Sequence, residues 1–151
     1  MIKYAIILSG GVGSRLGGDL PKQFIEINGK PILRHTIEKF QFADPEIKLI
    51  VVMKPELKQQ WKDYCEKSCF LEKYVMPSGG ITRFHSVQNA LRYIEDDSLI
   101  AVHDGVRPFI TPEFVRNLFE KTVEYQANRL AKMENLTPEM LSRIEEEDVG
   151  L

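Results

Sequence analysis

Short apolar runs alternate with segments of helical periodicity along the first two thirds of the chain. Lys3–Leu8, Leu49–Met53 and Leu99–His103 are apolar runs that Gly or Pro follows within two residues, so we predict buried parallel strands there. A weaker strand is predicted at Tyr74–Met76. Strand–helix alternation predicts a mainly parallel sheet with helices on both faces and ligands bound beyond the carboxyl ends of the strands.

Apolar residues at helical spacing predict three helices between these strands. A fourth helix is predicted to start at Pro112, with Thr111 as its N-cap, because proline is favoured in the first helical position. Trp61 and Tyr64 fit the core face of the second helix better than a stacking platform for a ligand. The predicted core positions are Ile32, Leu33, Ile37 and Phe40 in the first helix, Leu57, Trp61 and Tyr64 in the second, and Phe84, Val87, Leu91 and Ile94 in the third.

The character of the sequence changes at Thr122, after which Glu, Asn, Lys and Arg dominate. We predict a nucleotide-binding domain over residues 1–121 and an atypical charged helical tail over residues 122–151. The one helix that the pattern of the tail supports begins after Thr137-Pro138, and Glu145–Asp148 is interpreted as a solvated end.

Composition narrows the range of partners. With 151 residues, 43% of them hydrophobic, the chain is the size of one ordinary globular domain, and 20 Lys and Arg against 22 Asp and Glu leave no basic footprint for nucleic acid. The apolar runs are too short to span a membrane and the first residues do not resemble a signal peptide, so we expect a cytoplasmic protein. Cys65 and Cys69 are expected to be free thiols, because no His lies near them to complete a zinc site.

A glycine-rich loop directly follows the first predicted strand, running from Ser9 to Gly17. Glycines let backbone N–H groups approach a phosphate closely. The loop is not a P-loop, because no Gly-Lys-Ser/Thr closes it, and Leu16 occupies the third glycine position of the dinucleotide-binding pattern. Arg15 and Lys22 would suit the charge that develops during nucleotidyl transfer, whereas an ordinary tight turn with two solvated cations is the simpler alternative.

Three ordered motifs resemble those of the 2-C-methyl-D-erythritol 4-phosphate cytidylyltransferases. They are the loop Gly10–Arg15 followed by Pro21-Lys22-Gln23, the segment Gly79–Val87 and the segment Val102–Pro108. The resemblance runs from about Met1 to Glu120. It implies a Rossmann-like nucleotidyltransferase fold, CTP as a substrate, Mg²⁺ as the metal and a homodimer as the usual assembly.

The resemblance also implies roles for individual residues. Arg15 and Lys22 would be catalytic, Arg107 would bind the acceptor, and Asp104 would hold the metal. The implied nucleotide-binding residues are Ser9, Gly10, Gly11, Gly13, Gly80, Arg83, Ser86 and Asp104.

Physical reasoning keeps simpler alternatives open at several of these positions. Ser86 could bond its own helix backbone, and Arg83 could be an exposed residue of a first helical turn. Asp104 could cap a turn, and Arg107 could form a salt bridge within its loop. His85 and His103 are interpreted as hydrogen-bonded scaffold, because a phosphate nucleophile needs no strong general base.

The sequence departs from the family after Glu120. Members add a dimer-forming arm, a Gln-Thr-Pro-Gln-like segment near the acceptor and a further lysine, and Thr122–Leu151 contains none of these. We therefore expect a fold truncated on its carboxy-terminal side, with an intact CTP half. The predicted reaction is transfer of CMP from CTP to 2-C-methyl-D-erythritol 4-phosphate with release of pyrophosphate. The alternatives are transfer to ribitol 5-phosphate, or a non-catalytic nucleotide-binding fragment.

Overall fold

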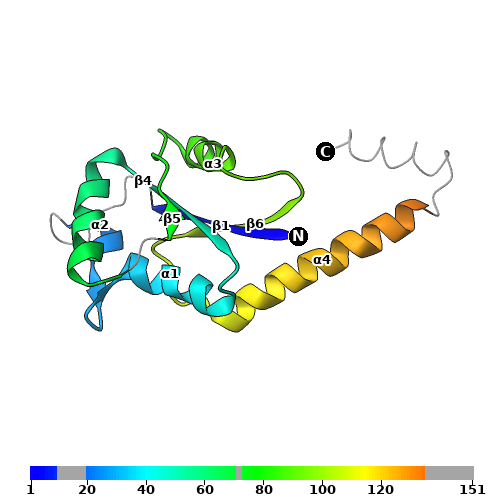
Figure 1. The fold of residues 1–151 in the computed structure, drawn as a ribbon, viewed down its shortest axis with the longest axis horizontal. Helices are drawn as coiled ribbons and strands as arrows, with labels where there is room; N and C mark the ends of the chain where they lie inside the picture. The colour runs from blue at the N-terminus through cyan, green and yellow to red at the C-terminus, as the bar shows by residue number, and fades with distance from the viewer. Residues whose placement is uncertain (10–19, 71–72, 135–151) are drawn as a thin grey trace. The chain divides into compact units, whose positions relative to one another are not determined.

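The computed structural model describes residues 1–9, 20–70 and 73–134, with side chains described through residue 127. The chain divides into two compact units, residues 1–117 and 118–151. The first unit contains a parallel sheet and the helices that cover it (Figure 1). The residues of the candidate site belong to this first unit.

Four parallel strands form the sheet in the order β5-β4-β1-β6. The central strand β1 pairs with β4 on one side and with β6 on the other, so the two longest pairings share it. All four strands were predicted from the sequence, each within one residue at both ends. Their bounds are β1 Ile2–Ser9, β4 Lys48–Met53, β5 Tyr74–Val75 and β6 Ser98–Asp104.

The four predicted helices are also present. They are α1 Ile32–Ala43, α2 Pro55–Lys67, α3 Arg83–Leu91 and α4 Pro112–Glu134. The Phe114 N–H donates to Thr111 Oγ1 at 3.1 Å, which confirms the predicted cap of α4. Two features were not predicted: the one-turn helix η1, Lys22–Phe24, and a hairpin of β2, Glu26–Ile27, with β3, Lys30–Pro31.

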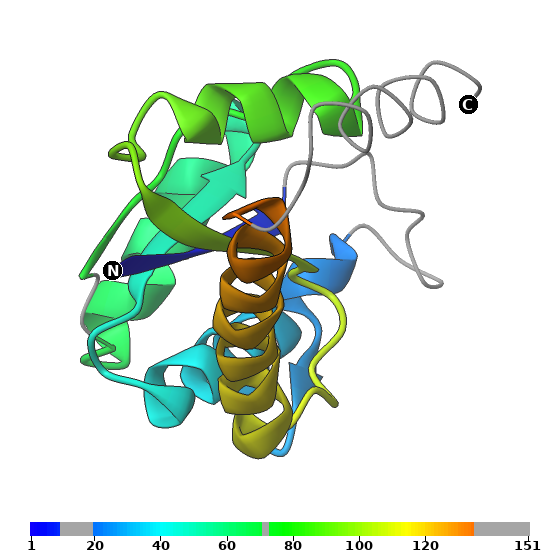
Figure 2. The ribbon, with the colours of Figure 1, turned by 90° about the vertical axis from the view of Figure 1, so that its right-hand side faces the viewer.

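One face of the sheet packs against α3. Alternate residues of a strand point to the same side, so Tyr4, Ile6 and Leu8 share this face with β4 residues at matching positions. The resulting core consists of Tyr4, Ile6, Leu8, Ile50, Val52 and Ala90, with Ile2, Val87 and Ile94 at its margin. Figure 2 shows α3 and α1 on opposite sides of the sheet.

The other face packs against α1, η1 and α2. Leu33, Ile37 and Phe40 of α1 are almost fully buried, as their spacing predicted. Trp61 of α2 is also fully buried, stacks on Phe24 with ring centroids 6.1 Å apart, and donates its indole N–H to the Tyr74 hydroxyl at 2.8 Å. The prediction that this tryptophan is a core residue is confirmed.

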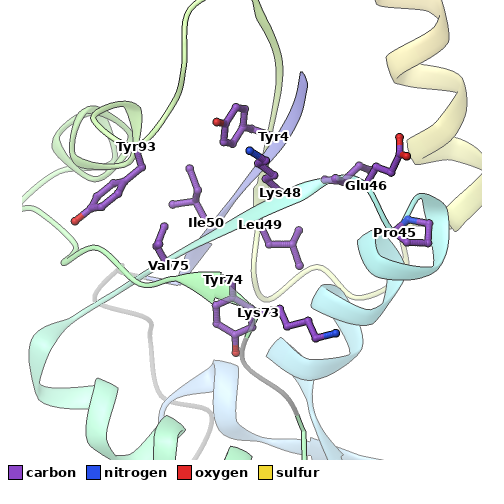
Figure 3. A pocket seen from close by; sticks show the side chains of 11 residues that line it. Tyr4, Pro45, Glu46, Lys48, Leu49, Ile50, Lys73, Tyr74, Val75 and Tyr93 are labelled. Atoms are coloured by element: carbon purple, nitrogen blue, oxygen red, sulfur yellow. The ribbon is translucent and has the colours of Figure 1, made fainter. Parts of the chain in front are cut away.

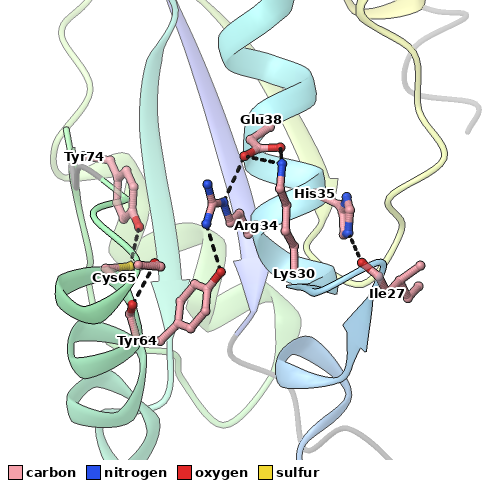
Figure 4. Close-up of polar contacts among 9 residues, drawn as sticks. Ile27, Lys30, Arg34, His35, Glu38, Tyr64, Cys65 and Tyr74 are labelled. Carbon is pink, nitrogen blue, oxygen red and sulfur yellow. Dashed lines mark hydrogen bonds and ion pairs between the residues drawn. The ribbon is translucent and has the colours of Figure 1, made fainter.

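A polar network joins α1 to its neighbours on the same face (Figure 4). Arg34 donates to Glu38 at 2.9 Å and to the Tyr64 hydroxyl at 3.0 Å, and the hydrogen bond to Tyr64 is the main cause that raises the pKa of Arg34. Lys30 also pairs with Glu38, at 3.3 Å. These contacts tie the hairpin, α1 and α2 together without placing an unpaired charge in the core.

The predicted core face of the third helix was partly wrong. Phe84 is 70% exposed and Leu91 45% exposed, while Ile94 lies beyond the last residue of α3. The helix instead approaches the sheet through the small residues Ser86 and Ala90, which are its buried positions. Small side chains allow α3 to lie close to the strands, and the larger ones then fall at its exposed margin.

The chain beyond Thr122 also differs from the expectation. Helix α4 continues without interruption to Glu134, and the Thr122 hydroxyl donates to the Leu118 carbonyl one turn earlier at 2.7 Å. The change of composition at Thr122 does not interrupt this helix, because Glu, Lys, Arg and Gln are good helix formers even where a core-facing stripe is weak. The helix predicted after Thr137 lies outside the described residues. Within the described part of the chain, no helix is both long and apolar enough to cross a membrane.

Candidate functional site

The predicted site residues that the structure describes gather at the carboxyl edge of the sheet. In the parallel register, Leu8 lies beside Asp104 and Ser9 beside Met53, so the last residues of β1, β4 and β6 lie at one edge. The segment after β5 joins them, since the Gly79 N–H donates to the Met53 carbonyl at 2.9 Å. Segments far apart in sequence thus converge where ligands bind in folds of this kind.

Asp104 lies between two arginines that the sequence analysis assigned separately. Arg83 Nη1 is 2.8 Å from Asp104 Oδ1, and Arg107 Nε is 3.3 Å from Asp104 Oδ2. Both guanidinium groups are more than half exposed, while the carboxylate is 30% exposed. The salt bridge that was the alternative reading for Arg107 is therefore present. The carboxylate orients two cations, each with N–H groups left over for an anion.

Ser86 serves to hold the glycine segment against α3. Its hydroxyl is buried and accepts a hydrogen bond from the Gly80 backbone N–H at 3.1 Å, instead of bonding the backbone of its own helix. An added Cβ at Gly80 would overlap the Cβ of His85, so this close approach requires glycine. Thr82 caps α3 by accepting from the His85 N–H at 3.2 Å.

Two further side chains hold the same segment and were not identified from the sequence. Lys58 of α2 donates to the Ser78 hydroxyl at 3.0 Å, and Asn89 of α3 donates to the Ser78 carbonyl at 2.8 Å. Both are polar residues on helices of ordinary composition, so no local pattern marks them. The tertiary structure alone shows that residues 78–80 are held from both flanking helices.

The end of β1 is tied to the segment that carries Lys22. Gln23, next to Lys22 in η1, is buried and donates its side-chain amide to the Ser9 carbonyl at 3.3 Å. The Ser9 hydroxyl is buried and has no hydrogen-bond partner among the described residues. Gly105 packs alongside, with its N–H donating to the Leu8 carbonyl at 2.8 Å. Lys22 therefore begins a helical turn that is anchored at the same sheet edge as Asp104.

The two histidines of the motifs are hydrogen-bonded as predicted. His103 Nε2 donates to the Arg107 carbonyl at 2.9 Å, which closes the turn that carries that arginine. Its ring also lies 5.5 Å from the ring of Phe40. His85 Nδ1 lies 2.8 Å from the Thr82 hydroxyl at the start of α3. Both contacts fit a scaffold role.

Four of the predicted site residues lie outside the described residues. They are Gly10, Gly11, Gly13 and Arg15 of the glycine loop. Ser9 and Lys22, on either side of this segment in the sequence, are described.

The side chains at this edge suit a metal ion that is coordinated partly by substrate phosphates better than a metal ion that is coordinated by protein ligands alone. Among the described residues no group of three or more His, Cys, Asp and Glu side chains could enclose a metal ion. Mg²⁺ commonly takes one or two carboxylates and fills its other positions with water and substrate phosphate. Asp104 fits as one such carboxylate, because each of its oxygens has a second lone pair besides the one that faces an arginine.

A cavity of about 600 Å³ lies elsewhere, at the opposite end of β4 (Figure 3). Its wall includes Tyr4, Lys48, Tyr74 and Tyr93 and contains none of the predicted site residues. The candidate site is therefore assigned to the carboxyl edge because polar groups converge there, and not because of a cavity.

Comparisons with known proteins identify the family of this chain. The family model described as 2-C-methyl-D-erythritol 4-phosphate cytidylyltransferase matches residues 3–134. The chain belongs to this family. The match extends past Glu120, where the resemblance was expected to end, and covers the described length of α4.

Relatives with the same description cover most of this chain. The protein of Bacteroides thetaiotaomicron is 43% identical over 127 residues, which are 84% of this chain and 58% of the relative. The protein of Porphyromonas gingivalis is 40% identical over 119 residues, or 78% of this chain and 52% of the relative. The chain thus spans only about half to three fifths of the length of these curated relatives.

Solved structures show the same fold. The 4-diphosphocytidyl-2C-methyl-D-erythritol synthase of Anaerococcus prevotii superposes with a TM-score of 0.62 and 29% identity, over 83% of this chain and 50% of that one. The bifunctional IspDF of Campylobacter jejuni also has a TM-score of 0.62, at 24% identity, over 81% of this chain and 30% of that one. The α/β nucleotidyltransferase fold predicted from the sequence is confirmed.

Proposed function

We propose that this chain provides the CTP-binding half of a cytidylyltransferase site. In the proposed reaction a phosphate oxygen of 2-C-methyl-D-erythritol 4-phosphate attacks the α-phosphorus of CTP. A new P–O bond forms as the bond between the α-phosphorus and the bridging oxygen breaks, and pyrophosphate leaves. The convergence of Lys22, Gly80 and the Arg83–Asp104–Arg107 cluster at one sheet edge supports this proposal best.

The proposed roles follow from the contacts of each residue. The Gly79–Gly80 backbone lies close against α3 and would bind the base edge, with the Ser86 hydroxyl free to donate a hydrogen bond while it accepts from Gly80. Asp104 would hold Mg²⁺ or ribose hydroxyls and orient both arginines. Arg107, the more exposed of the two, would bind the phosphate of the acceptor. Arg15 and Lys22 would stabilise charge on the α-phosphate and on the leaving pyrophosphate.

Mg²⁺ would supply a further positive charge to the phosphates. The chain's own contribution is to position groups, because phosphoryl and nucleotidyl transfer depend mainly on orientation and charge stabilisation. We propose that the protein is an enzyme that acts on small-molecule substrates in the cytoplasm, with neither nucleic acid nor membrane as a partner.

Nucleotide binding is the first test of this proposal. CTP with Mg²⁺ should raise the melting temperature of the chain more than ATP or GTP does, because a ligand selective for the folded state stabilises it. In any preparation that releases pyrophosphate from CTP, Lys22→Ala should lower kcat by about two to four orders of magnitude. Lys62→Ala, an exposed lysine on α2, is the matched control. Equal melting shifts with all three nucleotides would remove the case for cytosine recognition.

Turnover is a separate question from binding. Because positioning of the acceptor can contribute about 7–11 kcal/mol to such a reaction, a site with few acceptor contacts should turn over slowly even when CTP is bound. We therefore expect CTP binding by this chain to be robust and its pyrophosphate release with 2-C-methyl-D-erythritol 4-phosphate to be weak. A parallel assay with ribitol 5-phosphate separates the two acceptors.

A further inference from the structure

The segment between β5 and α3 is held where it crosses the carboxyl end of β4. The Met53 N–H donates to the Pro77 carbonyl at 3.1 Å, and the Gly79 N–H donates to the Met53 carbonyl at 2.9 Å. The Ser78 carbonyl, which belongs to the same peptide unit as the Gly79 N–H, accepts from the Asn89 side-chain amide of α3 at 2.8 Å. This peptide unit therefore has a partner at each end and cannot rotate without losing one of them.

The next peptide unit, between Gly79 and Gly80, has a partner at one end. The Gly80 N–H donates to the Ser86 hydroxyl at 3.1 Å. Because this peptide bond is trans, the Gly79 carbonyl points the opposite way, away from that hydroxyl. Among the described residues no group donates to the carbonyl of Gly79 or of Gly80. Both carbonyls are therefore acceptors that a ligand can use.

Two consecutive glycines make the direction of these carbonyls easy to change. Glycine has access to more backbone conformations than any other residue, so the peptide unit between Gly79 and Gly80 can flip at little steric cost. Ser86 opposes a flip from the Gly80 side. Asn89 opposes it from the other side, because its bond fixes the peptide plane that precedes Gly79. Ser86 and Asn89 lie three positions apart and so share one face of α3.

Lys58 of α2 adds a second contact to the same residue. Its ammonium donates to the Ser78 hydroxyl at 3.0 Å. Lys58 is half-buried, whereas Lys62, one turn later on the same helix, is exposed. Ser78 is thus held through its carbonyl by α3 and through its hydroxyl by α2, which are helices on opposite faces of the sheet.

Backbone acceptors of fixed direction suit an amino group on the ligand. Cytosine carries an exocyclic amino group, which donates, where uracil carries a carbonyl oxygen, which only accepts. A uracil oxygen opposite a backbone carbonyl leaves both acceptors unpaired, and sites built for a donor reject ligands that lack it. A flipped Gly79–Gly80 peptide would present its N–H instead and favour uracil. Discrimination between the two bases therefore requires that the carbonyl direction is fixed.

We propose that Asn89 and Lys58 are positioning residues that set the selectivity for cytosine over uracil. Neither residue needs to touch the base, because both hold Ser78 and Ser78 orients the peptide units that follow it. Asn89 has the larger effect, since it bonds the backbone directly, whereas Lys58 acts through a side chain. This inference rests on the proposed binding of CTP at this edge.

The test is the ratio of the dissociation constants of UTP and CTP, each measured with Mg²⁺ on the purified chain. Asn89→Ala should lower the preference for CTP by about three- to tenfold, which is the range expected for the loss of one hydrogen bond. Gln88→Ala, which alters the exposed neighbour on α3, should leave the ratio unchanged. A purely structural role for Asn89 would weaken the binding of both nucleotides alike and would not change the ratio.

Lys58 provides a second test from another helix. Lys58→Met should lower the preference for CTP by about two- to threefold, because it removes the donor to the Ser78 hydroxyl. Lys58→Arg retains N–H donors and should restore most of the preference. Lys62→Met is the matched control and should behave as the wild type. These variants decide the question if Asn89→Ala fails to fold.

Two results would overturn the proposal, and they differ in what else they remove. If the wild type prefers CTP and both Asn89→Ala and Lys58→Met keep that preference, the positioning role is wrong while the proposed CTP site stands. If the wild type binds CTP and UTP equally, cytosine recognition at Gly79–Gly80 is wrong, and the positioning role fails with it.

Discussion

The two faces of the sheet are covered in different ways. Helix α1 buries five of its twelve residues, among them Leu33, Ile37 and Phe40, and α2 adds the fully buried Trp61. Helix α3 buries only Ser86 and Ala90 and leaves Phe84 exposed to solvent. One face is thus packed with large side chains, and the other is covered by a short helix that approaches the strands through small residues.

Because of this difference, we expect the α1 face to contribute mainly to stability and the α3 side to contribute mainly to the candidate site. The α1 face provides most of the large buried side chains, whereas the α3 side carries the cap at Thr82, the glycine contact at Gly80 and the ion pair of Arg83. A helix with small buried residues can bring backbone groups within reach of a ligand, which a thick layer of aromatic side chains would prevent. We therefore expect substitutions on the two faces to differ in what they change.

The largest expected effect is that of Trp61→Ala. This change removes a fully buried indole, its stacking on Phe24 and its hydrogen bond to Tyr74, so the free energy of unfolding should fall by about 3–5 kcal/mol. Phe84→Ala on the other face should change it by less than about 0.5 kcal/mol. Urea denaturation of both variants measures the contrast, and similar losses in the two would contradict it.

An intermediate effect is expected for Gly80→Ala. The new Cβ meets His85 at the start of α3, so strain should lower the free energy of unfolding by about 1–3 kcal/mol and reduce the melting shift that CTP produces. A double-mutant cycle with His85→Gly sharpens the explanation, because removing the facing Cβ should recover part of the loss as a coupling of about 0.5–3 kcal/mol. Strict additivity would show that the overlap is not the cause.

The smallest expected effect concerns Asp44, at the end of α1. Its pKa is lowered from the usual 3.8, first by the hydrogen bond from the Glu46 N–H and then by Lys3, whose ammonium is 3.0 Å away. The stabilisation is therefore fully present above the usual pKa of Asp and is lost as pH falls through the lower pKa of the folded state. Since the pair is partly exposed, Asp44→Asn should cost less than about 1 kcal/mol at neutral pH.

The measurement for Asp44 is the free energy of unfolding of wild type and Asp44→Asn at neutral pH and near pH 3. The gap between them should narrow at the acidic pH. A gap of the same size at both pH values would mean that the carboxylate charge contributes nothing there.

The sequence determined the elements and the edge at which they meet. Apolar runs that end in Gly or Pro located β1, β4 and β6, and the Thr111-Pro112 pair located the start of α4, because strand burial and helix capping are local requirements. The hairpin of β2 and β3 was missed although its signal was present, since Asn28 and Gly29 both adopt positive φ in the tight turn between the strands. Strands of two residues are too short to show alternation.

Only the tertiary structure decided how the motif residues meet. The sequence placed Arg83, Asp104 and Arg107 in two motifs, but their convergence on one carboxylate depends on the parallel register that sets the end of β6 beside β1, and on the packing of α3 on the same sheet. The hydrogen bond between Ser86 and Gly80 is likewise absent from any local pattern. Such features arise from contacts between segments distant in the chain, and residue spacing specifies only what lies within a few turns or along one strand.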